Sequence, residues 1–124
     1  VRRRCIGDRY LEALRGVEGL KFQVDEFEGN RNGCWVFGVL LDSHSRYPNA
    51  QSAMAAFAKV GIGTRPFFFP LHQQPLIGNY THRTLGELPI SEKLGTDGFY
   101  LPNGLGMSDA DLDRAVSISR EILS

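Results

Sequence analysis

The chain has 124 residues with 14 basic and 14 acidic side chains, so its formal net charge at pH 7 is zero. This balance argues against a protein that mainly binds phosphate backbones or an anionic membrane surface, and favours a small molecule or another protein as the partner. Two cysteines, Cys5 and Cys34, are too few for a disulfide framework, and neither a secretory leader nor a long apolar span is evident. We therefore expect a cytoplasmic protein in which the sequon at Asn79–Thr81 is incidental. The start at Val1, inside helical sequence, suggests a fragment.

Apolar periodicity and turn residues divide the chain into alternating helices and strands. In chain order the sequence predicts a helix at 6–17, strands at 20–24 and 34–41 joined by a turn at 28–33, a helix at 49–61, a strand at 64–69, a loop at 70–86, a helix at 89–94, a strand at 99–101 and a helix at 108–122. The strand at 34–41 is almost wholly apolar and is therefore expected at the centre of its sheet. Asn49 is a good N-cap, and Gly61 follows the second helix where a left-handed residue usually ends one.

Single residues refine the second half of the chain. Pro66 places the strand at 64–69 at a sheet edge or makes it end there, because proline cannot donate to a central ladder. Gly95 is predicted to stop the short helix, and Ser108 with Asp111 forms a variant capping box for the last helix. The loop at 70–86 is unusually long, and long ordered loops are often functional. The whole pattern predicts one α+β layer sandwich spanning residues 1–124.

Several candidate chemistries can be set aside on spacing alone. Gly61–Gly63 follows a helix instead of a strand, which is the reverse of a phosphate loop. The acidic segment at 25–33 lacks the ligand pattern of a calcium loop. Cys34 lies in an apolar run, where a thiol is inert. The histidines lack a helical ligand spacing, so we expect no metal site. They are His44, His72 and His82.

The lysines also argue against catalysis by this chain alone. Lys21, Lys59 and Lys93 are the only lysines, and each lies in a polar or amphipathic setting that leaves it protonated. A lysine that forms a Schiff base must instead be desolvated, so none of the three is expected to serve as a catalytic amine. A hydrolase that uses Cys34 or His72 has no supporting constellation.

Residues 64–75 form the exception among these segments. Three aromatic side chains stiffened by prolines lead into His72, Gln73 and Gln74, which donate and accept hydrogen bonds without being ions. Such a loop could hold a polar, hydroxyl-rich ligand. An ordinary surface loop with a satisfied histidine is the alternative that these residues leave open.

The same segment carries a family resemblance. Residues 61–75 read GIGTRPFFFPLHQQP, which resembles a hallmark of the DegT-type sugar aminotransferases. Members of that family are pyridoxal-phosphate enzymes that convert keto groups of nucleotide-linked sugars to amines. Further similarity covers residues 9–14, 35–42, 90–102 and 107–123, and the string with Ile90–Leu94 is most similar to perosamine synthases.

The resemblance implies that this chain is the C-terminal small domain of such an enzyme. The expected fold is a two-layer sandwich of a small, mainly antiparallel sheet with helices, as in the small domain of aspartate-aminotransferase-type enzymes. The pyridoxal phosphate and its lysine would belong to a large domain that is absent here, so we expect no catalytic, cofactor-binding or metal-binding residue in this chain. The substrate-binding residues that it implies are Arg65, Phe67, His72, Gln73 and Gln74.

The expected partners are the nucleotide sugar and further copies of the chain, because faces that once packed on a large domain would be left apolar. Neither nucleic acid nor a membrane is expected as a partner. The alternative is a free-standing non-catalytic protein, derived from such a domain, that binds a sugar nucleotide or assembles with another chain.

Overall fold

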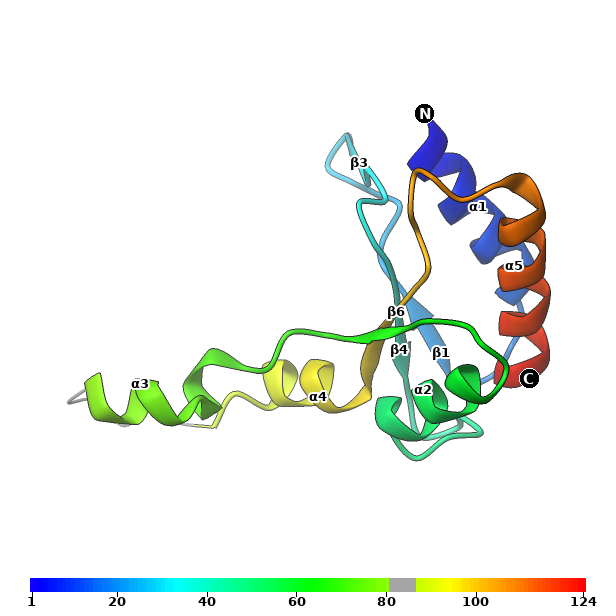
Figure 1. Ribbon diagram of the computed structural model, residues 1–124. Coiled ribbons are helices and arrows are strands. Elements are labelled where there is room, and N and C mark those ends of the chain that lie inside the picture. The colour runs from blue at the N-terminus through cyan, green and yellow to red at the C-terminus, as the bar shows by residue number, and fades with distance from the viewer. Residues whose placement is uncertain (81–86) are drawn as a thin grey trace.

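A computed structural model describes residues 1–80 and 87–124 of the chain. Figure 1 shows a sheet with helices packed on one side and a long arm that extends from the other. The elements are α1 Arg2–Leu14, β1 Leu20–Phe22, β2 Glu26–Phe27, β3 Asn30–Arg31, β4 Phe37–Leu41, α2 Ala50–Lys59, β5 Arg65–Pro66, the 3₁₀ turn η1 Leu71–Gln73, α3 Pro75–Tyr80, α4 Pro89–Asp97, β6 Gly98–Leu101 and α5 Asp109–Leu123.

The main sheet has the strand order β1-β4-β6-β5, and every neighbouring pair is antiparallel. β4 lies between β1 and β6, which confirms the central position predicted from its apolar run. β5 is an edge strand, as Pro66 predicted. The small antiparallel sheet with helices confirms the predicted α+β fold class.

The core lies between the sheet and the helices α1, α2 and α5. Alternate residues of β4 and β6 point to this side, and Tyr10 of α1 stacks on Phe37 with ring centroids 4.9 Å apart. Phe57 of α2 packs against Phe99 in a tilted arrangement, with ring centroids 5.9 Å apart. The Tyr10 hydroxyl donates to the Pro102 carbonyl at 3.0 Å, and burial raises the pKa of that phenol. The inward-facing strand residues are Phe37, Val39, Leu41, Phe99 and Leu101.

Three of the predicted helix ends are confirmed, whereas the helix predicted at 6–17 runs from Arg2 to Leu14. The Asn49 side chain accepts the Ser52 backbone N–H at 2.9 Å and so caps α2. Gly61 follows this helix with φ +74°, where a side chain would be strained. Ser108 and Asp111 make both hydrogen bonds of a capping box at the start of α5.

The hairpin before β4 differs from the prediction. β1 does pair with β4, but the connection contains its own two-stranded ribbon, β2–β3. Glu28 and Gly29 both have positive φ at its tip, as a type I′ turn requires. Cys34 was predicted inside the strand; it has φ +48° and the strand begins only at Phe37, because the chain bends there between ribbon and sheet.

Three predictions for residues 64–97 differ from the structure. The segment predicted as a loop at 70–86 contains η1 and α3, since Pro75 has the backbone angle that starts a helix. The helix predicted to stop at Gly95 runs to Asp97. Gly95 is required for packing, because a Cβ there would meet the Pro70 ring at 2.8 Å. The strand predicted at 64–69 is only two residues long.

Candidate functional site

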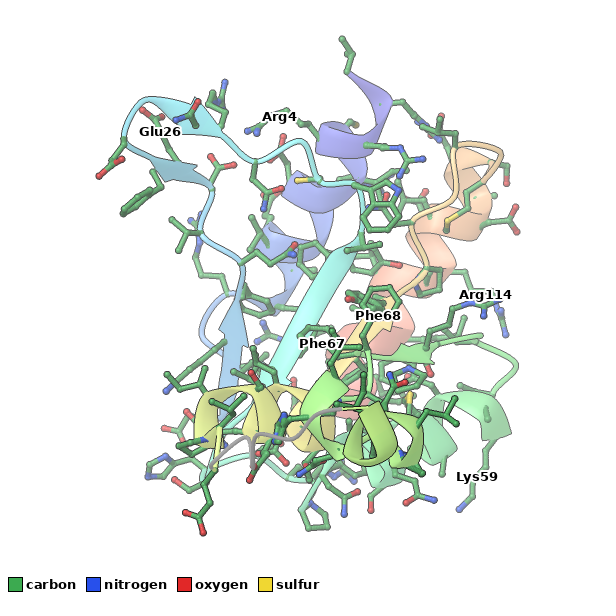
Figure 2. The ribbon with its side chains drawn as sticks, turned by 90° about the vertical axis from the view of Figure 1, so that its left-hand side faces the viewer. Arg4, Glu26, Lys59, Phe67, Phe68 and Arg114 are labelled. Atoms are coloured by element: carbon green, nitrogen blue, oxygen red, sulfur yellow. The ribbon has the colours of Figure 1, made fainter. Side chains whose placement is uncertain are left out.

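The arm, which we define as residues 67–97, begins on the side of the sheet opposite the core. Gly38 and Tyr100 are paired neighbours on β4 and β6 and point to this side, as does Gly98. Phe67 packs its ring over the two glycines and stacks on Tyr100 with centroids 4.5 Å apart. Figure 2 looks onto this side, with Phe67 and Phe68 in front of the sheet. Phe67 therefore fixes the direction in which the arm leaves the sheet.

A groove runs between the start of the arm and α4. Its volume is about 510 Å³, and we call it the arm groove. Its walls are largely apolar, and the lining residues with polar side-chain atoms are His72, Ser91 and Tyr100. Such a lining, mostly hydrophobic with few polar groups, is typical of sites for small molecules. The groove is lined by Phe67, Phe68, Phe69, Pro70, Leu71, His72, Leu88, Ser91, Leu94 and Tyr100.

His72 is held in this groove by Glu92. Its Nε2 lies 2.9 Å from Glu92 Oε1, and the histidine side chain is only 8% exposed. Glu92 also accepts the Leu88 backbone N–H at 3.2 Å. The hydrogen bond from His72 and then that from Leu88 lower the pKa of the Glu92 carboxyl. Because a carboxylate can only accept, Nε2 carries a hydrogen, and Nδ1 remains as the ring's second polar atom.

Arg65 lies two residues before the start of the arm. It is exposed on the edge strand β5, directly across from Tyr100. A second pocket of about 370 Å³ opens beside it, which we call the edge pocket. Phe68 and Tyr100 line both this pocket and the arm groove, so the two are neighbours. The edge pocket is lined by Trp35, Val36, Arg65, Pro66, Phe68 and Tyr100.

The structure thus brings Arg65, Phe67 and His72 together but not the two glutamines. Gln73 ends η1 and is exposed, whereas Gln74 is half-buried. Neither lines the arm groove or the edge pocket. Their roles in substrate binding therefore stay predictions that rest on the family resemblance alone.

Sequence reasoning missed three residues of this region: Glu92, Trp35 and Tyr100. Glu92 stands in a string that already resembled the family, but its partner is 20 residues away along the chain. Trp35 and Tyr100 were interpreted only as strand residues. Tyr100 faces the side of the sheet away from the core because the register places it opposite Gly38 and Arg65. Trp35 lies just before β4 and is 66% exposed.

Within the described part of the chain, the other candidates form no second site. Cys34 is buried, and burial is the largest cause that raises the pKa of its thiol, so it is a poor nucleophile. Within residues 1–80 and 87–124, no group of three or more metal-ligating side chains comes together, and no helix is long and apolar enough to cross a bilayer. His82 and Thr81 of the sequon lie outside the described residues.

None of the three lysines fits the cofactor chemistry that the resemblance implies. Lys21 and Lys59 are exposed at the surface, and the Lys93 ammonium is paired with Asp97 at 2.7 Å. A lysine that binds pyridoxal phosphate must be desolvated, and these three side chains are exposed or ion-paired. Accordingly, no step of transamination can be assigned to a lysine of this chain.

The fold is that of known aminotransferases. TlmJ of Streptoalloteichus hindustanus superimposes on 98% of this chain with a TM-score of 0.80 and 26% identity, and the chain covers 31% of TlmJ. The PLP form of Spr1654 from Streptococcus pneumoniae superimposes on 99% of the chain with a TM-score of 0.78; its 19% identity shows the fold alone, and the chain covers 32% of it.

The sequence assigns the chain to one family. The model of the DegT/DnrJ/EryC1/StrS aminotransferase family matches residues 1–119, so the chain belongs to that family. A GDP-perosamine synthase of Caulobacter vibrioides is 38% identical over 93 residues, which are 75% of this chain and 24% of that protein. The chain therefore spans between about a quarter and a third of the length of the relatives it matches.

Proposed function

We propose that this chain is the small domain of a cytoplasmic, oligomeric aminotransferase that acts on nucleotide-linked keto-sugars. The observation that supports this most directly is the nearly buried His72, oriented by Glu92 in a largely apolar groove, within a chain of the DegT-type family. The relative named GDP-perosamine synthase makes a nucleotide-linked amino sugar the expected product class. Pyridoxal phosphate would supply the amino-transfer chemistry from a larger domain, since no lysine of this chain fits that role.

The residues of this chain would bind and orient the sugar. With Nε2 engaged by Glu92, the His72 ring presents Nδ1 as an acceptor when neutral and as a donor when protonated. Either state can hydrogen-bond to a sugar hydroxyl. The apolar walls around it lower the local dielectric, which strengthens such a bond.

Single-turnover kinetics of the complete enzyme carrying this domain would test the role of His72. A hydrogen bond to a substrate hydroxyl contributes roughly 0.5–1.5 kcal/mol, so His72→Ala should lower kcat/KM of the keto-sugar half-reaction about threefold to tenfold. The half-reaction with the amino donor should change much less, because it does not involve the sugar nucleotide. A general-base role would instead cost about a hundredfold to ten-thousandfold.

His44→Ala is the matched control, since that imidazole is 78% exposed and lies outside both pockets. It should leave both half-reactions unchanged. Equal losses in the two half-reactions with His72→Ala, or no loss in either, would contradict the proposed role and return His72 to a purely structural one.

A further inference from the structure

A single oxygen of Glu92 joins η1 to the start of α4. Oε1 lies 2.9 Å from His72 Nε2 and 3.2 Å from the Leu88 backbone nitrogen, which donates to it. The Glu92 backbone N–H in turn donates to the Leu88 carbonyl at 3.0 Å, so both its backbone and its side chain bind the residue that precedes the helix. The carboxylate is therefore held by α4 itself, independently of its contact with His72.

The imidazole of His72 depends on that oxygen for its orientation. η1 is a turn of three residues, and its backbone hydrogen bonds fix the main chain but not the rotation of a side chain. Among the side chains of residues 1–77 and 87–124, Glu92 is the one hydrogen-bond partner of the ring. Because the ring is only 8% exposed, a different rotamer would leave its N–H group buried and unpaired. Glu92 thus fixes both the rotation of the ring and the nitrogen that carries the hydrogen.

Glu92 itself does not belong to the surface that a ligand would touch. His72 and Ser91 line the arm groove, whereas Glu92 is not among the described residues that line it. Its Oε1 already accepts two hydrogen bonds, from η1 and from the residue before α4. An effect of Glu92 on a ligand in the groove is therefore exerted through His72.

We propose that Glu92 is a positioning residue for the keto-sugar half-reaction. By accepting from Nε2, it holds the His72 ring in one orientation and leaves Nδ1 as the atom that meets the sugar. The ring is then ordered before the substrate arrives, whereas a free ring would have to be ordered on binding, which weakens binding. The carboxylate acts by the position of its oxygen and not by its charge. The inference rests on the proposed function, which supplies the hydrogen bond between His72 and the sugar.

The His72 ring gives a readout that needs no substrate. Its two nitrogen resonances can be followed by long-range proton–nitrogen NMR in the 124-residue chain, at a pH above about 8, where a free imidazole is neutral. In the wild type they should be widely separated, as one tautomer with its hydrogen on Nε2 requires. In Glu92→Ala they should move toward each other, because the ring then exchanges between tautomers. The resonances of His44, which is 78% exposed, are the internal control and should not move.

A double-mutant cycle in the complete enzyme tests the effect on the reaction. Glu92→Ala should lower kcat/KM of the keto-sugar half-reaction about twofold to tenfold, which corresponds to the cost of ordering one side chain. The half-reaction with the amino donor should not change. In a His72→Ala background the same substitution should cause no further loss, because two residues that act as one unit are not additive.

Two further variants separate position, charge and helix stability. Glu92→Gln keeps an oxygen that can accept both hydrogen bonds but removes the charge, so kcat/KM should stay within about twofold of the wild type. Its His72 resonances should remain separated. Lys93→Ala removes the ion pair with Asp97 on the same helix, outside both pockets, and should leave both half-reactions unchanged.

Three results would overturn this inference. They are unchanged His72 resonances in Glu92→Ala, additive losses in the double mutant, and a Glu92→Gln variant as impaired as Glu92→Ala. The first involves no substrate, so it would leave the proposed function standing. The proposed function would fail by a different result, a complete enzyme that turns over no nucleotide-linked keto-sugar, and the positioning role would then fail with it.

Discussion

The packing of Phe67 predicts a measurable loss of stability when its ring is removed. The ring covers Gly38, where an added Cβ would approach it at 2.9 Å, and stacks on Tyr100 at 4.5 Å. A fully buried Phe→Ala change costs about 3–5 kcal/mol, and Phe67 is half-buried, so Phe67→Ala should lower the unfolding free energy by about 2 kcal/mol. At roughly 4 °C per kcal/mol for a chain of this length, Tm should fall by about 8 °C.

Urea and thermal unfolding followed by far-UV circular dichroism would measure this loss. The neighbouring residue supplies the control, because Phe68 is 78% exposed and Phe68→Ala should change the unfolding free energy by no more than about 0.5 kcal/mol. Equal effects of the two variants, or a Phe67→Ala chain as stable as the wild type, would refute the conclusion that Phe67 anchors the arm to the sheet.

Three further outcomes are expected. Ser108→Ala removes the cap of α5 and should cost about 1 kcal/mol in urea unfolding, whereas Ser117→Ala, exposed within the same helix, should cost much less. His72→Ala should raise the pKa of Glu92 toward its usual value near 4.5, as measured by carbon NMR. Because the pKa of Glu92 is lowered in the folded chain, the stabilisation from this pair is present above pH 4.5. It is lost as the pH falls through the pKa of the folded state. The purified chain should form dimers or larger species in light scattering through apolar side chains of the arm, and only monomer at high concentration would contradict this. These side chains are Phe69, Leu71, Leu76, Leu88 and Ile90.

Features set by local sequence were predicted well. The caps at Asn49 and Ser108 involve hydrogen bonds within one turn, so the residue types alone identify them. The central position of β4 follows from its composition, since only a strand buried by its neighbours can be almost wholly apolar. The position of Gly61 after α2 was predicted for the same reason, because glycine locally favours the left-handed backbone that ends a helix.

Features set by long-range packing were not predicted. Gly95 resembles a helix stop until the Pro70 ring is found against it, 25 residues away in the chain. Cys34 resembles a strand residue until the bend between the ribbon and β4 is seen. The contact between His72 and Glu92 joins η1 to α4, and no periodicity links a loop residue to a helix beyond it.

The glycines of the sheet connect these two kinds of feature. Gly38 and Gly98 leave space on the side away from the core, and Phe67 fills that space. A side chain at either glycine would displace the ring, and the arm would then leave the sheet in another direction. Since Arg65 precedes this anchor and His72 follows it, the anchor sets the distance between them. The spacing of the two polar groups in the candidate site therefore depends on an apolar ring and on two glycines that have no side chain.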